Sequence, residues 1–316
     1  MKKLIAVVVV VVGIVVVASL ACGRGGPSIE TPSQPVTSGS SGSSPERALC
    51  LAAVDGTAGA VDKTIADAQR AIAANAGKSD LWIVLGRAWV EKARNSGDPG
   101  FYLHADACAK EVLQSEPDNR LAIDLRGLSL MNGHQFVAAK ALEQQVLAKN
   151  ADDLMAWGTL SDAELELGDV DGAERSLARM MALKPSLPSY VRTSYLRWLH
   201  GDVEGALDAI RLAIDAGKGQ KDHEPEAWVL TEAANLFWMR GDVDGSLRGY
   251  EMALAVKSDH PAALVGKARC LIAQGKAAEA VPLLQEAFEK SRRVDTAWWT
   301  SKAYTAAGDD VAAAQW

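Results

Sequence analysis

Three aspartate-rich turns are the first places in this chain where residue types and spacing could do chemistry. They read Gly168-Asp-Val-Asp-Gly-Ala173, Gly201-Asp-Val-Glu-Gly-Ala206 and Gly241-Asp-Val-Asp-Gly-Ser246. Alternating acidic residues before a glycine are typical of a calcium loop, but an EF-hand loop also needs a third oxygen ligand before its glycine and a glutamate six residues after it. Six residues after Gly172 the chain has Ala178. We therefore predict that these aspartates cap helices and that the turns hold no metal ion.

The histidines and the common nucleophile motifs give no sign of a catalytic centre. None of the five histidines forms a His-x-x-x-His pair or a similar metal-binding spacing; they are His104, His134, His200, His223 and His260. The sequence has no Gly-x-x-x-x-Gly-Lys-Ser/Thr loop, no Gly-x-Ser-x-Gly elbow and no Cys-x-x-Cys pair. We predict no catalytic residue, no metal site and no cofactor, and therefore that the chain is not an enzyme.

Three cysteines follow Cys22, and the sequence leaves two interpretations of them open. Cys50 and Cys108 fall in neighbouring predicted hairpins, so an exported protein could join them in a disulfide and leave Cys270 as a free thiol. Alternatively, all three are small buried apolar residues, which is common for free cysteine.

The composition is that of an ordinary acidic globular protein. The 316 residues are 48% hydrophobic, with 33 basic and 40 acidic side chains and a formal net charge of −7. Neutralising phosphates requires a clustered excess of Lys and Arg, so we expect no nucleic-acid partner. The apolar fraction is high enough to offset the entropy of ordering a chain, which excludes disorder as the main state.

The first 45 residues are typical of an export leader and a tether. Residues 1–21 begin with Lys2 and Lys3, continue with an uncharged run that is mostly valine, and end at Ala21. A positive start, an apolar stretch and a small residue before a cleavage site predict a signal peptide. Residues 22–45 are rich in Ser, Gly and Pro, which predicts a flexible tether that holds the next domain away from a membrane surface.

The residues before Cys22 resemble the lipobox of bacterial lipoproteins, in which cleavage leaves an N-terminal cysteine that then carries lipid. Ala21 and Cys22 fit this pattern, whereas Ser19 stands where the family has an aliphatic residue. The resemblance implies lipidation of Cys22 and a bacterial cell-envelope location, as an outer-membrane lipoprotein facing the periplasm. An uncleaved signal anchor and simple secretion are the alternatives, because the apolar run is near the lower limit of about 17 to 25 residues for a membrane span.

A repeat runs through the rest of the chain. Successive turn glycines are separated by 33, 40, 34 and 33 residues; they are Gly168, Gly201, Gly241, Gly275 and Gly308. Each glycine stands between two segments with helical spacing of apolar residues, and Asp169 or its equivalent follows as a helix cap. A helix hairpin alone cannot bury its apolar stripe, so a period near 34 predicts a stacked array of hairpins.

This pattern resembles the tetratricopeptide repeat, which has Trp, Leu, Gly, Tyr, Ala, Phe or Tyr, Ala and Pro at fixed places in 34 residues. The matches in one unit are Trp157, Leu160, Ala173, Leu177, Met180 and Pro185. The resemblance covers residues 79–316 and implies an all-α, right-handed superhelical solenoid of antiparallel hairpins, with an incomplete last repeat. Residues 46–78 are interpreted as a degenerate N-terminal hairpin. Residues 188–224 form an irregular segment longer than one repeat, in which we expect a polar excursion at residues 218–224 to bend the superhelix.

Aromatic residues supply the main functional signal. In tetratricopeptide arrays the first helices of successive hairpins line a concave surface on which peptides or helices dock. Trp82, Trp89 and Trp157 stand at signature packing places, so we expect them in the core. The helical phase predicts a second group on the inner surface, as a binding groove or as packing residues: Tyr195, Trp198, Trp228, Asn235, Trp238, Met239, Arg269, Trp298 and Lys302.

The sequence therefore favours a membrane-tethered scaffold that captures peptide or helical segments of another envelope protein in its groove. One alternative is that residues 79–316 are the recruiting or regulatory region of a longer enzyme truncated after Trp316. Another is self-association through an uncapped C-terminal end, because a solenoid normally closes with a polar capping helix.

Overall fold

The computed structural model describes residues 10–11, 14–15, 44–54, 59–96, 98–219 and 223–316. Two short strands in the expected leader, β1 (Val10–Val11) and β2 (Ile14–Val15), pair antiparallel. The expected lipidation site Cys22 and most of the expected tether lie outside the described residues. Within the described ranges, no helix combines the length and the apolar character needed to cross a membrane.

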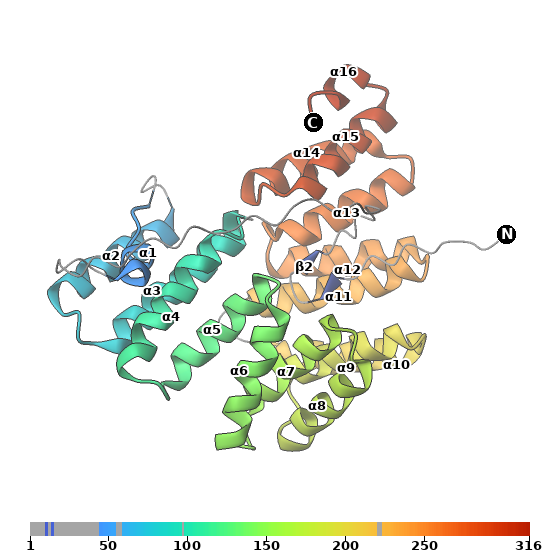
Figure 1. The fold of residues 1–316 in the computed structure, drawn as a ribbon. Coiled ribbons are helices and arrows are strands. Elements are labelled where there is room, and N and C mark those ends of the chain that lie inside the picture. The colour runs from blue at the N-terminus through green and yellow to red at the C-terminus, as the bar shows by residue number, and fades with distance from the viewer. Residues whose placement is uncertain (1–9, 12–13, 16–43, 55–58, 97, 220–222) are drawn as a thin grey trace, which may run out of the picture.

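The described part beyond residue 78 folds into seven successive helix hairpins, which confirms the predicted all-α tetratricopeptide-type solenoid (Figure 1). The first helices of the hairpins are α3 (Ser79–Ser96), α5 (Arg120–Asn132), α7 (Leu154–Glu166), α9 (Leu187–Leu199), α11 (Glu224–Met239), α13 (Pro261–Ala273) and α15 (Val294–Ala307). The second helices are α4 (Phe101–Ser115), α6 (Phe136–Lys149), α8 (Val170–Leu183), α10 (Val203–Gly217), α12 (Val243–Val256), α14 (Ala277–Lys290) and α16 (Asp310–Ala313).

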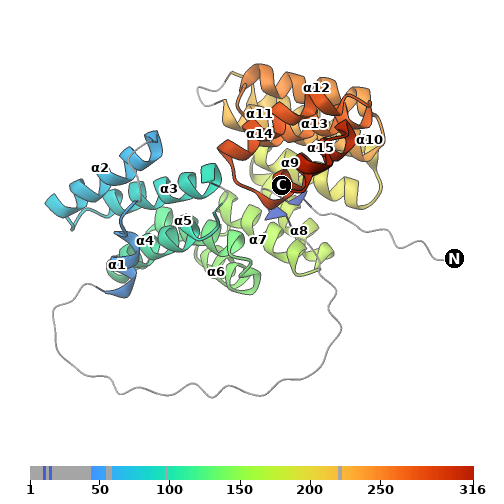
Figure 2. The same cartoon turned by 90° about the horizontal axis from the view of Figure 1, so that it is seen from above.

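The hairpins stack in sequence order and form a curved array. Each second helix packs on its own first helix and on the first helix of the next hairpin. Seen from above, α1 to α6 form one part of the array and the hairpins from α9 onward the other, with α7 and α8 between them (Figure 2). Alanines fill the closest approaches between helices, as at Ala173, Ala206, Ala253 and Ala280, all fully buried.

The turns inside the hairpins have the structure that the sequence predicts. The five turn glycines adopt left-handed conformations with φ between 78° and 85°, which residues with a Cβ avoid. After four of these glycines, an aspartate accepts a hydrogen bond from the backbone N–H three residues later; Asp169 accepts from Gly172 at 2.9 Å, and Asp242 from Gly245 at 2.8 Å. Gly275 is followed by Lys276, which makes no such bond. The prediction that these aspartates cap helices is confirmed.

The turn between α5 and α6 follows a different pattern. Its left-handed residue is His134, with φ of 55°, although Gly133 directly precedes it. His134 also contacts Phe136 edge-to-face, with ring centroids 5.5 Å apart. A non-glycine residue in this region is strained, so this hairpin has a less favourable turn than its neighbours.

The segment predicted to be longer than one repeat contains an ordinary hairpin followed by a long connection at the expected place. Helices α9 and α10 pack together like the other pairs, with a left-handed Gly201 and an Asp202 cap between them. The extra length lies after α10, where residues 218–223 separate it from α11. The insertion therefore lengthens a connection between repeats and leaves the repeat itself intact.

Two helices precede the repeats. Helix α2 (Ala60–Ala74) packs on α3, whereas the short α1 (Pro45–Cys50) packs on α4. A disulfide joins Cys50 to Cys108 in α4, with the Cα atoms 4.9 Å apart. Trp89 donates a hydrogen bond to the Cys50 carbonyl at 2.9 Å, so α1 also closes over a buried tryptophan. Cys270 is a buried free thiol.

Candidate binding groove

Four of the sequence-predicted site residues occupy the same place in successive first helices. Tyr195, Asn235, Arg269 and Lys302 are separated by 40, 34 and 33 residues, the same spacings as the turn glycines. The residue before Tyr195 and the residue before Lys302 face the second helix, because Ser194 and Ser301 each donate a hydrogen bond to a carbonyl of that helix at 2.8 Å. We call the surface formed by these four residues and the indole rings beside them the inner strip.

Arg269 is the centre of the inner strip. Its guanidinium carbon lies 4.5 Å from the ring centroid of Trp238 in α11 and 5.3 Å from that of Trp299 in α15. Its Nε atom is buried and has no hydrogen-bond partner among the described residues. Two cation–π contacts therefore hold the guanidinium in one orientation, while an N–H that could bind an acceptor stays unused.

Lys302 and Trp298 continue the strip on α15. The Lys302 Nζ atom lies 5.3 Å from the ring centroid of Trp298, which packs edge-to-face on Trp299 with ring centroids 4.7 Å apart. Trp298 is 52% exposed, which is high for a side chain of this size. This end of the strip offers an exposed indole face beside a lysine.

Asn235 is held in place by its neighbours. The Tyr250 hydroxyl, from α12, donates a hydrogen bond to the Asn235 carbonyl oxygen at 2.6 Å. Burial raises the pKa of Glu232, one helical turn before Asn235, to about 7, and the hydrogen bond from Asn235 opposes this shift. Burial also raises the pKa of Tyr250 to about 12. The amide is thus fixed by a buried tyrosine and a carboxyl that is easily neutralised.

Tyr195 ends the strip on the side of α7. Its ring stacks on Trp198 with centroids 5.8 Å apart, and its hydroxyl is buried without a hydrogen-bond partner in the described ranges. Burial raises its pKa, and so do the carboxylates of Glu166 and Glu232. One oxygen of Glu166 is likewise buried and unpartnered within these ranges, and burial raises the pKa of this residue.

The remaining predicted residues combine packing with exposure. Trp198 and Trp228 pack partly buried against the core between α9 and α11, and Trp238 packs against the core between α11 and α13. Met239 is 45% exposed. The packing interpretation therefore applies to the three tryptophans, and the groove interpretation stays a prediction.

Sequence reasoning missed three residues of this surface: Trp299, Glu232 and Glu166. Trp299 follows Trp298, and its ring centroid lies 5.3 Å from the Arg269 guanidinium carbon, a contact that could have been found only with the orientation of α15 relative to α13. Of the tryptophans expected in the core, Trp82 and Trp89 are buried and Trp157 is partly buried. Trp82 and Trp157 each donate a hydrogen bond to the carbonyl six residues earlier.

The arginines of the first helices α5 and α9 form ion pairs, unlike Arg269. Arg192 in α9 donates two hydrogen bonds to Asp162 in α7, at 2.8 and 2.6 Å. Arg120 in α5 binds Asp153 at 2.5 and 2.7 Å and also pairs with Asp124 at 2.5 Å. These arginines are neutralised inside the protein, whereas Arg269 meets no carboxylate in the part of the chain that the structure describes.

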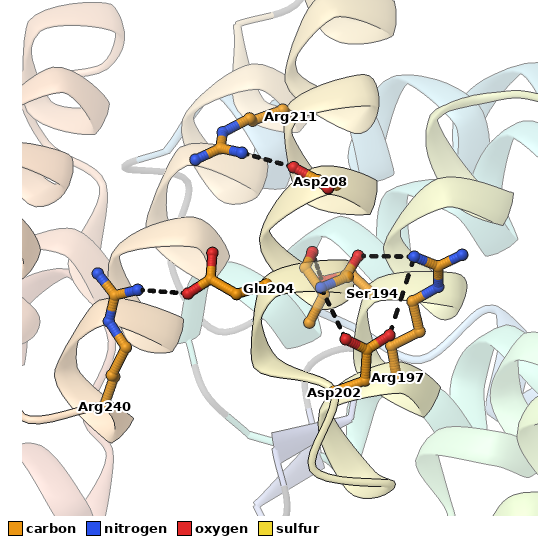
Figure 3. A network of polar contacts seen from close by, with 9 residues as sticks. Ser194, Arg197, Asp202, Glu204, Asp208, Arg211 and Arg240 are labelled. Atoms are coloured by element: carbon orange, nitrogen blue, oxygen red, sulfur yellow. Dashed lines mark hydrogen bonds and ion pairs between the residues drawn. The ribbon is translucent and has the colours of Figure 1, made fainter.

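Polar contacts around the turns lie outside the inner strip (Figure 3). Asp202 accepts a hydrogen bond from the Gly205 N–H, and Arg197 donates one to the Gly205 carbonyl at 3.3 Å. Arg240, at the end of α11, pairs with Glu204 in α10 at 3.1 Å and so links successive turns. Because these groups satisfy one another within the array, they explain packing rather than binding.

No arrangement in the described residues points to catalysis by a metal ion. In these ranges no three His, Cys, Asp or Glu side chains are grouped so that they could hold a metal. The groups of the strip whose pKa is raised are Tyr195, Glu166 and Glu232, and the Arg269 guanidinium lies against indole rings. The chemistry that this arrangement supports is the binding of a ligand, through indole faces and unpartnered hydrogen-bonding groups.

Comparison with known proteins agrees with the fold. Two profiles described as tetratricopeptide repeat match residues 125–188 and 237–313. The chain is similar to TTC0263, a thermophilic tetratricopeptide protein of Thermus thermophilus, at 17% identity and a TM-score of 0.55, covering 62% of this chain and all of that one. Comparison with curated protein sequences gives no match.

Two further solved structures share the fold at low identity. Cut9 in the APC/C Cut9–Hcn1 hetero-tetramer has 14% identity and a TM-score of 0.61; the alignment covers 78% of this chain but only 47% of the matched one, so the chain spans about half of that protein's length. PilW, a type IV pilus biogenesis factor, has 16% identity and a TM-score of 0.52, with coverage of 61% and 88%. From its hairpin repeat and these matches, the chain is a tetratricopeptide repeat protein, whose fold supports protein–protein interaction.

Proposed function

We propose that this protein is a membrane-tethered scaffold of the bacterial cell envelope that captures a peptide or helical segment of another envelope protein. The observation that carries this proposal is the inner strip, where aromatic rings of α9, α11 and α15 lie beside Arg269 and Lys302, and where the Tyr195 hydroxyl and the Arg269 Nε have no hydrogen-bond partner in the described structure. Buried polar groups are normally paired, so several unpaired ones on one face favour a site completed by a ligand.

The leader and its cysteine support the envelope location. A signal peptide followed by Cys22 and a Ser/Gly/Pro tether would place the array at a membrane while leaving it free to search for a partner. Among the proteins of similar fold, PilF from Pseudomonas aeruginosa and PilW are pilus-related envelope proteins. Replacing Cys22 with Ala should prevent lipid attachment and leader cleavage, which intact-mass measurement of the purified chain detects; an unchanged mass would favour an uncleaved anchor.

The groove is tested by co-purification. The full-length chain would be recovered from cross-linked, detergent-solubilised envelopes as wild type, as Trp198→Ala plus Trp238→Ala, and as Leu212→Ala plus Met252→Ala. Leu212 and Met252 are 50% and 57% exposed on the second helices α10 and α12, so they form a matched control away from the inner strip. We expect the tryptophan variant alone to lose its partners. Unchanged recovery of every partner with that variant would refute the groove.

A further inference from the structure

The inner strip contains two cations that lack a counter-ion in the described part of the protein. The contacts described for Arg269 and Lys302 are with indole rings, and neither residue forms an ion pair in those ranges. We propose that these two cations bind the carboxylates of an acidic, extended peptide segment. This inference rests on the proposed function and specifies the chemistry of its partner.

The orientation of Arg269 favours a carboxylate. A guanidinium is planar and donates two parallel hydrogen bonds to a carboxylate, a geometry that Arg192 and Asp162 show within this protein. The Trp238 and Trp299 rings lie against the Arg269 guanidinium, so binding would cost little additional side-chain ordering.

The repeat spacing sets the separation of the acidic residues. Arg269 and Lys302 occupy the same place in neighbouring first helices, and packed helices lie about 8 to 10 Å apart. An extended peptide rises roughly 3.3 Å per residue. Two carboxylates that reach both cations would therefore be separated by about three residues. The exposed indole of Trp298 lies beside Lys302 and offers an apolar contact for an intervening side chain.

The rest of the strip argues against a nucleic acid. Beyond these two cations the strip continues with Asn235, Tyr195 and the carboxyls of Glu232 and Glu166, so a longer run of phosphates would meet no further positive charge on these described residues. A short acidic peptide needs only the two cations and can use the polar and aromatic groups beside them.

The test uses the full-length chain in neutral detergent micelles and fluorescence anisotropy with three probes. The first is a short labelled peptide of Leu, Ser and Ala with two glutamates about three residues apart. The second has glutamine at both places, and the third is a single-stranded RNA of the same net charge as the first. The protein variants are Arg269→Gln and Lys302→Gln, with Arg248→Gln, an exposed arginine on the second helix α12, as the control.

We expect the glutamate peptide to bind about tenfold or more tightly than the glutamine peptide, because charge-assisted hydrogen bonds are worth more than neutral ones. Arg269→Gln and Lys302→Gln should each remove most of that difference, and added salt should weaken it. Arg248→Gln should change nothing. Equal affinity for the two peptides would overturn this inference and leave the groove itself intact.

Tighter binding of the RNA with the same dependence on Arg269 would overturn the inference in favour of a phosphate ligand. Failure of every probe to bind would also refute it, whereas the capture of an envelope partner is judged separately by the tryptophan variants. The failure of this inference and the failure of the proposed function are therefore distinguishable.

Discussion

The first helices α5 and α9 and the first helices α13 and α15 carry similar charges but place them differently. Arg120 in α5 and Arg192 in α9 each meet an aspartate of a neighbouring segment, as Arg192 meets Asp162 at 2.6 Å. In α13 and α15, Arg269 and Lys302 lie on indole rings and meet no carboxylate in the described structure. The paired charges are neutralised within the array, whereas Arg269 and Lys302 have no ion pair in the described residues, as the proposed binding requires.

The N-terminal region is also the one that is cross-linked. Cys50–Cys108 ties α1 to α4 across a sequence separation of 58 residues, and Arg47 adds an ion pair with Glu111 at 3.4 Å. Buried side-chain atoms that lack a partner in the described ranges occur in both regions, on Asp106, Arg120, Arg126 and Glu143 in the first and on Glu166, Tyr195 and Arg269 on or next to the inner strip. The comparison predicts that substitutions in the first region mainly change stability, and those in the second mainly change binding.

The largest expected effect is that of removing the disulfide. Cys108→Ser should lower the free energy of unfolding of the first hairpins by about 4 kcal/mol, from the loop-closure entropy of a cross-link of this length. Denaturant unfolding of the full-length chain should then show the N-terminal hairpins unfolding first. Cys270→Ser, which removes only the buried free thiol, is the control. Equal effects of the two variants would contradict the stabilising role of the cross-link.

The next largest effect concerns the paired arginine. Arg192→Ala should destabilise the protein by about 2 kcal/mol, because it leaves the Asp162 carboxylate, 9% exposed, without its bidentate partner. Chemical denaturation measures this loss. The matched change Arg197→Ala affects a more exposed arginine on the same helix, whose ion pair with Asp202 is 4.0 Å long, so its cost should be smaller. A larger loss of stability in Arg197→Ala than in Arg192→Ala would show that the pair of Asp162 and Arg192 does not stabilise the fold.

A buried carboxyl gives the N-terminal region a pH dependence. Burial raises the pKa of Glu143 to about 8, and nearby Asp124 and Asp153 add to this shift while Arg120 opposes it. The folded chain therefore holds a proton that the unfolded chain releases near pH 4.5, and the associated stability is lost as the pH rises from about 4.5 to about 8. Glu143→Gln should flatten the fall in Tm across this range, and the exposed Glu286→Gln should not. A fall that persists in Glu143→Gln would assign it to other groups.

The smallest effect on stability is expected at the inner strip. Arg269→Gln should change the free energy of unfolding by only about 1 kcal/mol, the size of its cation–π contacts. Thermal unfolding of the same preparations that are used for peptide binding measures it. A loss comparable to that of Arg192→Ala would mean that Arg269 is a packing residue, and the contrast between the two regions would disappear.

The sequence predicted the hairpins well because the signals for them are local. Gly168 and Asp169 specify a turn and a helix cap through their own backbone and side-chain chemistry, and the structure shows that chemistry. The pairing of Cys50 with Cys108 was left open because spacing along the chain does not set which side chains meet in space.

The inner strip was only partly predictable. Repeat spacing placed Arg269 and Lys302 together, but the position of Trp299 against Arg269 depends on how α15 packs on α13. Glu143 was missed for the opposite reason. From the sequence alone, a glutamate on a second helix is expected to face solvent. The Glu143 carboxyl instead occupies the space that a side chain at position 127 would fill, and it is buried because that residue is glycine.

The central claim, that partners dock on the inner strip, is tested most directly by site-specific photo-cross-linking in intact cells. A photoreactive residue would replace Trp298, 52% exposed on the first helix α15, or Leu212, 50% exposed on the second helix α10. The account predicts a cross-linked partner from position 298 that disappears in the Arg269→Gln background, and none from position 212. Cross-links from position 212 alone, or equal cross-links from both positions, would contradict it.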